Sequence, residues 1–351
     1  MEARSRFGGR ILTVGSDEGA DCDLGPSWFW PGQPLVAGLL AHFKIPHYAQ
    51  FTDGDLLLQR PGGHIERSRG PSPMTGSRRV EGGINRLVDE IAAQIDPAHR
   101  FLAHTVTGLS VNGDRITIDA EGSSGQIQVR AKHVALAIPP RLAAELKYSP
   151  EPPEEVMQTL AATSTWMAGH AKFFAVYDEP FWRQQGLCGT ALCQGGPLAE
   201  IHDASPVAAN SFSLFGFSGL DPQSRASLGR AEFIEQATAQ LATLFGDQAN
   251  SPRAVYFQDW SCEKFTASVA DRRPQTHHPR YGLNLQMGSD WEGKLEFISS
   301  ETSFSNGGLI EGALNPVWGF PDGLQAWIHR SSMTARQPGA GSAGITGSDI
   351  R

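Results

Sequence analysis

The sequence has 351 residues, of which 40% are hydrophobic and 39 are glycine, a composition that excludes a chain disordered throughout. Its 29 basic and 37 acidic residues give a formal charge of −8, so we expect no nucleic-acid partner. No apolar run approaches the ~20 residues that span a bilayer, and the first ten residues lack the apolar segment of a signal peptide. We therefore expect no membrane partner and a cytoplasmic location.

The length suggests about two domains with a sizeable core. Four cysteines are too few for a disulfide framework, and neither a CxxC pair nor an HExxH helix suggests a metal site. We therefore expect no bound metal and reduced, packed cysteines. These are Cys22, Cys188, Cys193 and Cys262.

In the first 100 residues, the spacing of apolar side chains predicts two helices. Residues 36–43 have helical spacing, and residues 84–95 have it after the glycine turn at Gly82 and Gly83. Residues 55–60 form an apolar run that is typical of a short strand. This part of the chain is thus expected to mix helices and strands.

Residues 101–140 predict four strands in succession. Turn residues at 112–113 and 121–125 separate successive members. We expect a meander that ends in the buried run 133–138, because the proline pair at 139–140 stops it there.

The second half also predicts a mixture of helices and strands. Helices are expected at 154–160, 232–245 and 307–314, and strands at 170–177, 187–194, 211–217, 254–258 and 295–299. Residues 266–282 are expected to form a loop. The tail 331–351 is rich in Gly, Ser and Ala, and we expect it to be disordered.

The first ten residues place Glu2 and three arginines beside Gly8 and Gly9. A carboxylate at the end of a Rossmann strand binds the ribose of a dinucleotide, and arginines with exposed glycine amides suit its pyrophosphate. A solvated cluster of N-terminal charges has the same composition. Spacing alone leaves both interpretations open.

Many short motifs between residues 1 and 315 follow one order. They are 2–10, 23–31, Gly82–Gly83, 137–141, 166–172, 180–183, 259–260, 278–282, Glu301 and 308–313. In this order they resemble the flavin-containing monoamine oxidase family. The resemblance covers nearly the whole chain before the tail.

The resemblance implies an α/β (α+β mixed) flavoprotein with a Rossmann-like FAD-binding domain and a mixed-sheet substrate domain. The FAD-binding domain would comprise residues 1–47, 80–140 and 278–330, and the substrate domain residues 48–79 and 141–277. A typical member carries a Gly-x-Gly-x-x-Gly turn about thirty residues before the position of Glu2. The present sequence starts after that turn, so we expect an N-terminally truncated member that lacks the first βα unit.

The resemblance also implies which residues contact FAD. They are Glu2 and Arg4 on the adenosine side, Gly9 and Arg10 at the phosphates, Gly25, Pro26, Ser27 and Trp28 beside the isoalloxazine, Val106 at adenine, and Glu301, Leu309 and Ile310 near the flavin. No cysteine lies around residues 269–270, so we expect the FAD to be held non-covalently.

Lys172 is the candidate catalytic residue. It lies within the strand 170–177 on the same face as Phe174 and Val176, where a charged group must find a partner or lose its charge. In the family that this chain resembles, the matching lysine holds a water against flavin N5. The alternative is a lysine that reaches solvent at the strand edge.

Two departures from the family pattern concern the C-terminal part. Pro316 is expected to break the helix that begins near Gly307, and Ser299 stands where a glycine is usual. The leading hypothesis is an FAD-dependent amine oxidase that takes a small amine and O2. The alternative is a non-catalytic, flavin-free homologue or gene fragment.

Overall fold

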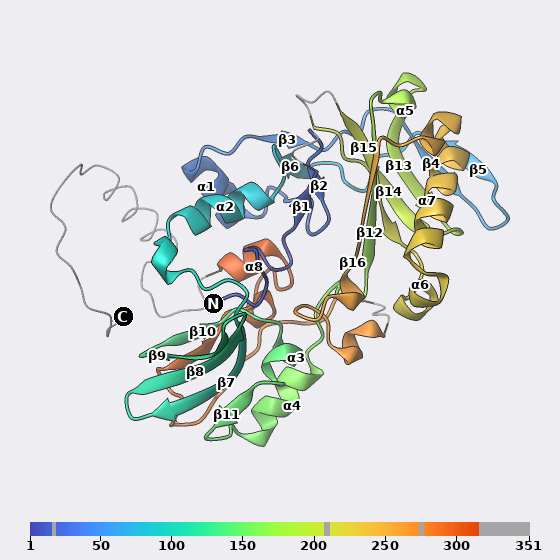
Figure 1. The fold of residues 1–351 in the computed structure, drawn as a ribbon. Coiled ribbons are helices and arrows are strands. Elements are labelled where there is room, and N and C mark those ends of the chain that lie inside the picture. The colour runs from blue at the N-terminus through green and yellow to red at the C-terminus, as the bar shows by residue number, and fades with distance from the viewer. Residues whose placement is uncertain (16–18, 207–210, 274–276, 316–351) are drawn as a thin grey trace. The chain divides into compact units, whose positions relative to one another are not determined.

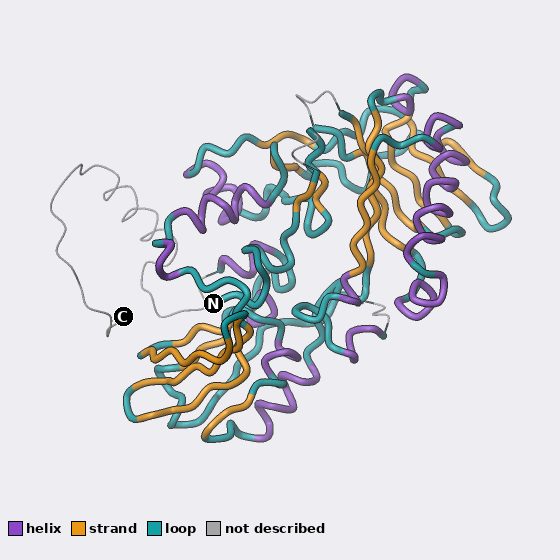
Figure 2. The backbone as a smooth tube through the Cα atoms, viewed as in Figure 1, coloured by secondary structure: helices purple, strands orange, loops and turns teal. Residues whose placement is uncertain are grey.

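The computed structural model describes residues 1–15, 19–206, 211–273 and 277–315. The chain forms two compact units, each built from separate stretches of sequence (Figures 1 and 2). Of the described residues, one unit comprises 1–6, 100–165 and 279–315; the other comprises those within 7–99 and 166–278. We call them the first and the second unit.

The second unit is built on a seven-stranded mixed sheet with the order β16-β12-β15-β14-β13-β4-β5. Its strands are β4 (Asp55–Gln59), β5 (Ile65–Ser68), β12 (Ala171–Tyr177), β13 (Leu187–Cys193), β14 (Leu198–Asp203), β15 (Phe212–Ser218) and β16 (Ala254–Asp259). Helix α7 (Arg230–Phe245) lies along this sheet in Figure 1. Its buried Phe233 and Leu241 pack with Phe173 and Leu214 in one apolar cluster.

Shorter elements complete the second unit. They are β1 (Thr13–Val14), β2 (Cys22–Asp23), α1 (Pro34–His42), β3 (His47–Ala49), β6 (Arg78–Val80), α2 (Asn85–Ala93), α5 (Phe181–Gln184) and α6 (Pro222–Leu228). Strands β1 and β2 pair with each other, as do β3 and β6. The segment that follows β2 lies against the sheet face on which Lys172 is found, as described below.

The first unit contains a four-stranded sheet with the order β11-β7-β8-β9 and a separate parallel pair, β10 and β17. Its elements are β7 (Thr105–Asn112), β8 (Arg115–Gly122), β9 (Gly125–Ala131), β10 (Val134–Leu136), α3 (Pro140–Ala143), β11 (Lys147–Ser149), α4 (Glu154–Ala162), β17 (Leu295–Phe297) and α8 (Ile310–Leu314). Val156 and Leu160 of α4 are buried against Trp291.

The structure confirms the predicted mixed α/β class and most of the predicted elements, but it differs from the predictions in several places. The run 133–138 does not extend the meander, because β10 pairs with β17 instead. Strand β14 was not predicted, and neither were several shorter elements, among them β5, β11 and α6. Helix α8 begins at Ile310 rather than near Gly307, because Gly308 has a φ of +79° and forms a turn.

The predicted division into FAD-binding and substrate domains follows function and stays a prediction; the compact units divide the chain at other positions. Pro316 and the tail 331–351 lie outside the described residues.

Candidate functional site

The candidate site begins at Lys172 on β12. Main-chain pairing places Lys172 opposite Phe217 of β15, and Phe217 opposite Glu200 of β14. Residues directly opposite each other project from the same face of a sheet, so these three side chains form one row. Phe174 and Val176 belong to the apolar cluster on this face, as the alternation along the strand predicts.

The Lys172 ammonium is bound by the segment that follows β2. Its Nζ donates hydrogen bonds to the carbonyl oxygens of Asp23 at 2.8 Å and Gly25 at 2.7 Å, and to Ser27 Oγ at 2.5 Å. These bonds use all three ammonium protons. Lys172 is 2% exposed, so the alternative of a lysine that reaches solvent is wrong.

Burial lowers the pKa of Lys172 well below its usual value, and the nearby Asp23 carboxylate partly opposes that effect. The ammonium also lies near aromatic rings, with its Nζ 4.5 Å from the ring centroid of Phe215 and 5.1 Å from that of Phe217. Such cation–π contacts favour the charged form. The site thus holds a lysine whose charge depends on its immediate surroundings.

Segment 23–28 is fixed from several sides. An ideal Cβ at Gly25 would lie 2.2 Å from the carbonyl oxygen of Arg10, so only glycine allows this close approach of two main chains. Trp28 Nε1 donates to Gln50 Oε1 at 2.7 Å, and Trp260 Nε1 donates to the carbonyl oxygen of Leu24 at 2.8 Å. The segment is therefore a rigid support for the lysine.

Sequence reasoning missed a carboxylate in the same row. Glu200 Oε1 lies 2.6 Å from Nε2 of His202, whose ring packs edge-on against Trp28 at 5.2 Å between centroids. His202 is fully buried, whereas the Glu200 side chain is 35% exposed. The only available signal was the pattern Glu200-Ile-His202, because strand β14 itself was not predicted.

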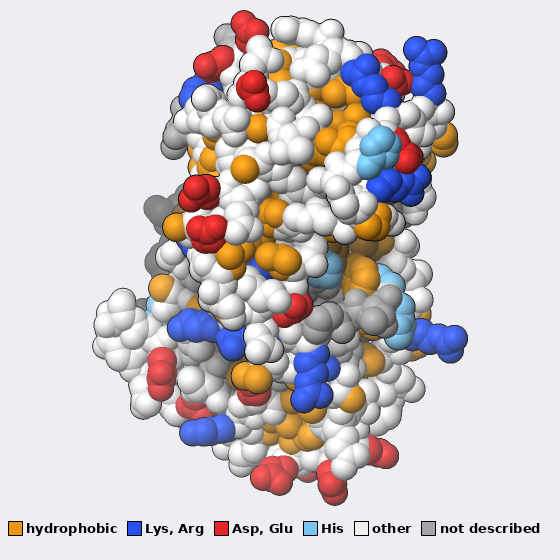
Figure 3. Space-filling view, turned by 90° about the vertical axis from the view of Figure 1, so that its right-hand side faces the viewer, with side chains coloured by type: hydrophobic (Ala, Val, Ile, Leu, Met, Phe, Trp, Pro, Cys, Tyr) orange, Lys and Arg blue, Asp and Glu red, His pale blue; other side chains and the backbone are white. Residues whose placement is uncertain are grey.

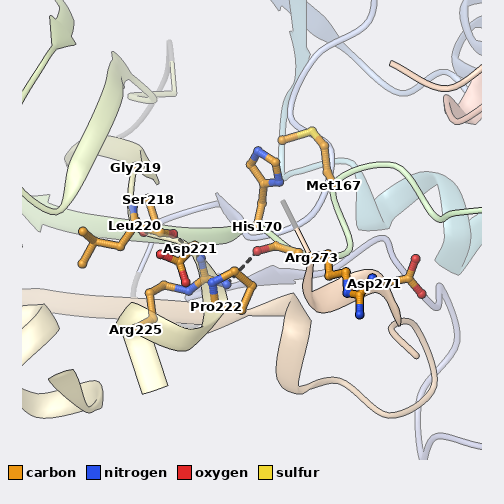
Figure 4. A pocket seen from close by; sticks show the side chains of 11 residues that line it. Met167, His170, Ser218, Gly219, Leu220, Asp221, Pro222, Arg225, Asp271 and Arg273 are labelled. Carbon is orange, nitrogen blue, oxygen red and sulfur yellow. Dashed lines mark hydrogen bonds between the residues drawn. The ribbon is translucent and has the colours of Figure 1, made fainter. Parts of the chain in front are cut away.

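A pocket of about 300 Å³ lies beside the start of β12 (Figure 4). It is lined by Met167, Gly169, His170, Ser218, Gly219, Leu220, Asp221, Pro222, Arg225, Asp271 and Arg273. Arg225 is bound to Asp259, and Asp221 caps α6. Burial, together with the charge of Arg225, lowers the pKa of His170. The pocket therefore presents a neutral imidazole two residues before Lys172.

The first unit contains the residues predicted for the adenosine side. Glu2 Oε1 accepts a hydrogen bond from the amide of Arg4 at 2.8 Å. The amide of Glu2 donates to the carbonyl oxygen of Phe101, and the amide of His104 donates to that of Glu2. Val106 follows in β7, so Glu2, Arg4 and Val106 lie on adjacent stretches of chain.

Three further predicted residues follow β17. Glu301 is fully buried, and its Oε2 accepts a hydrogen bond from Ser300 Oγ at 3.0 Å. Leu309 and Ile310 lie at the start of α8. The turn before that helix packs tightly, since an ideal Cβ on Gly307 would lie 2.5 Å from Tyr281 Cβ.

The second unit contains the remaining candidates. Gly9 has a φ of +56°, and an ideal Cβ at this position would meet no atom within 4 Å. The structure brings Arg10, Gly25, Ser27 and Lys172 together, and Pro26 and Trp28 lie in the same segment. The roles of all these residues as FAD contacts stay predictions.

Solved amine oxidases share this fold. A putrescine oxidase triple mutant superposes with a TM-score of 0.74 at 20% identity, covering 96% of this chain and 93% of that one. Cyclohexylamine oxidase from Brevibacterium oxydans gives a TM-score of 0.74 at 18% identity, covering 89% of each chain. The chain therefore has the same fold as these two oxidases.

Comparison with family models identifies the family of this chain. The model of the family described as "Flavin containing amine oxidoreductase" matches residues 1–76 and 62–315. The chain therefore belongs to this family, which confirms the resemblance. A Mycobacterium tuberculosis protein named as a flavin-containing monoamine oxidase is 31% identical over 242 residues, 67% of this chain and 50% of the relative.

Amine oxidase [flavin-containing] B of Canis lupus familiaris is 26% identical over 243 residues, 68% of this chain and 45% of the relative. The chain spans about half the length of the curated relatives it matches.

Within the described residues, no helix is long and apolar enough to cross a membrane. The same part of the chain contains no group of three metal-ligating side chains that could hold an ion. On the face drawn in Figure 3, acidic and basic side chains are interspersed. The cytoplasmic location and the absence of nucleic-acid partners stay predictions.

Proposed function

We propose that this protein is an FAD-dependent oxidoreductase of the amine-oxidase type. The substrate is a small-molecule amine, whose C–N bond is oxidised to an imine that water hydrolyses to an aldehyde and ammonia. When bound, the flavin accepts the hydride at N5 and passes the electrons to O2, which leaves as hydrogen peroxide. The observation that carries the proposal is the buried Lys172 ammonium, bound to segment 23–27.

The residues present fit a dinucleotide in two places. The open space over Gly9 leaves room for a phosphate beside the main chain. Ser299 is 4% exposed, and its Oγ has no hydrogen-bond partner among the described residues. It lies just after the carboxyl end of β17, which pairs in parallel with β10.

In this proposal the FAD is held non-covalently by the residues that the resemblance indicates. They are Glu2, Arg4, Gly9, Arg10, Gly25, Pro26, Ser27, Trp28, Val106, Glu301, Leu309 and Ile310. In its protonated form, Lys172 supplies a buried positive charge beside segment 23–28. A positive charge there stabilises negative charge that develops on oxygen, because little water reaches the site.

We expect the hydroxyl of Ser299 to bind the cofactor. Ser299→Ala should weaken FAD binding about tenfold, or about 1.4 kcal/mol. The same change should raise the free energy of unfolding of the flavin-free protein by about 1 kcal/mol, because it removes a buried, unpaired hydroxyl. Fluorescence titration with FAD and chemical denaturation measure the two quantities.

The matched control is Ser303→Ala, because Ser303 Oγ donates to the carbonyl oxygen of Ser305 at 2.6 Å. That variant should lose about 1 kcal/mol of stability and keep its affinity for FAD. If Ser299→Ala instead destabilises the flavin-free protein and leaves FAD affinity unchanged, the hydroxyl has a structural role only.

We propose that the half-exposed Glu200 carboxylate binds the cationic end of the amine substrate. Glu200→Gln should raise KM about tenfold with little change in kcat, because a charge-assisted hydrogen bond is replaced by a neutral one. The control is Glu66→Gln, since Glu66 lies at the edge of the same sheet and is paired with Arg60 at 3.1 Å. Equal KM values in the two variants would contradict the role of Glu200.

The proposed activity itself is tested with the FAD-loaded protein and a panel of primary amines, diamines and amino acids. We expect hydrogen peroxide and ammonia to form in equal amounts with at least one class of amine. A protein that binds FAD but yields neither product with any amine would favour the non-catalytic alternative.

A further inference from the structure

A buried ion pair lies behind the Lys172 site. Arg79 of β6 and Asp23 of β2 are each 1% exposed, and Arg79 Nη2 lies 3.5 Å from Asp23 Oδ2. Arg79 Nε and Nη1 have no hydrogen-bond partner among the described residues. Burying a guanidinium with unused donors costs folding free energy. We therefore ask which group the charge of Arg79 acts on.

Asp23 connects this pair to the lysine. Its Oδ1 accepts hydrogen bonds from Thr13 Oγ1 at 2.7 Å and from the amide of Ile84 at 3.0 Å, while its carbonyl oxygen accepts one from Lys172. The charged groups that act on Lys172 are therefore Asp23 and Arg79, with the thiol of Cys22 as a weaker influence.

The guanidinium has two further neighbours. Tyr48 lies opposite Arg79 in the pairing of β3 with β6, and the ring centroid of Phe215 lies 5.6 Å from Arg79 Cζ. Burial raises the pKa of Tyr48, so its phenol stays neutral. The charge of Arg79 and a hydrogen bond with Arg79 oppose that shift, whereas the charges of Asp23 and Asp21 add to it. The cluster thus contains two basic side chains, Lys172 and Arg79, and the carboxyl group of Asp23, all of them buried.

We propose that Asp23, kept ionised by Arg79, is a positioning residue that keeps Lys172 protonated beside segment 23–28. The functional meaning of this inference rests on the role proposed for Lys172. Burial raises the pKa of Asp23, and the charge of Arg79 is the largest influence that opposes the rise. Without Arg79 the carboxyl would take up a proton, and Lys172 would lose its counter-charge.

Two variants can distinguish an electrostatic role of Asp23 from a purely structural role. An asparagine at position 23 keeps an oxygen for Thr13 and Ile84 but loses the negative charge. Thr13→Val does the reverse, because it removes the hydrogen bonds that Thr13 Oγ1 makes with Asp23 and with the amide of Asn85 but keeps the carboxyl group. The two variants therefore distinguish the charge of Asp23 from its hydrogen bonds.

The test follows the pKa of Lys172 in the flavin-free protein by NMR, with lysine labelled with ¹³C at Cε. Lysines are few in this sequence, and Lys172→Met identifies the signal. We expect Asp23→Asn to lower the pKa of Lys172 by about one pH unit or more, and Thr13→Val to leave it nearly unchanged. An unchanged pKa in Asp23→Asn would overturn the proposal, as would equal shifts in both variants.

Arg79→Met tests the second half of the proposal. If Arg79 acts by keeping Asp23 ionised, its loss lowers the pKa of Lys172, as Asp23→Asn does. If Arg79 only repels the ammonium, its loss raises the pKa, and that result would overturn its assigned role. Because these titrations need no flavin, they can fail while the proposed oxidase activity stands, and the product assay with amines can fail independently of them.

Discussion

Replacing Lys172 by methionine is expected to slow reoxidation of the reduced flavin by oxygen about 100-fold, while FAD still binds. Methionine keeps the length of the stem and removes the ammonium, so the charge that stabilises negative charge developing on oxygen is lost. Stopped-flow mixing of dithionite-reduced, FAD-loaded protein with oxygen measures the rate without knowledge of the substrate.

Lys294→Met is the control for this experiment, because the Lys294 ammonium donates to the carbonyl oxygen of Asp290 at an exposed position. It should reoxidise at the rate of the unmodified protein. If Lys172→Met also keeps that rate, Lys172 is a packing residue that ties segment 23–27 to the sheet and has no part in oxygen chemistry.

The largest effect on stability is expected from Arg225→Met. The Arg225 side chain is 3% exposed and donates to both carboxylate oxygens of Asp259, at 2.7 and 2.8 Å. It also donates to the carbonyl oxygens of Gly169 and Leu220. Its loss leaves a largely buried carboxylate without its partner, so the free energy of unfolding should fall by about 3–5 kcal/mol.

The pH dependence of this loss has a definite sign. Burial alone would raise the pKa of Asp259, but hydrogen bonds from Arg225 and Ser261 outweigh it and hold the pKa below its usual value. The stabilisation is therefore present above the pKa of an unfolded aspartate, about 4, and is lost as pH falls below it. Chemical denaturation at pH 7 and at about pH 3.5 should show a smaller difference between the two proteins at the lower pH.

The exposed pair Arg60–Glu66 provides the comparison, because its two side chains are 47% and 41% exposed. Arg60→Met should cost at most about 1 kcal/mol. Equal losses in Arg60→Met and Arg225→Met would show that burial does not determine the strength of these pairs.

Local sequence patterns predicted the elements whose apolar spacing is regular. Helix α7 and strand β12 were found close to their predicted ends, because each repeats apolar residues over several turns or alternations. The patterns failed where pairing joins distant segments. Strand β10 pairs with β17, far along the chain, and no local signal separates it from the fourth strand of a meander.

The same limit applies to the site. The sequence indicated that Lys172 needs a partner, but its partners lie in segment 23–27, which only the folded chain brings to β12. Strand β14 carries one charged residue, Glu200, between Leu198 and Ile201, and its pairing with β15 shifts register between Leu198 and Glu200. The strand therefore lacks a regular alternation of apolar and polar residues, so the sequence pattern did not predict β14 or its residues Glu200 and His202.

The central claim is that this protein binds FAD and uses it to oxidise an amine. Anaerobic titration of the FAD-loaded protein with amines tests it most directly, since reduction of the flavin by substrate is observed before oxygen is involved. We predict that the flavin absorbance near 450 nm is lost on addition of at least one amine and returns when air is admitted. A protein that does not retain FAD, or a bound flavin that no amine reduces, would contradict the account.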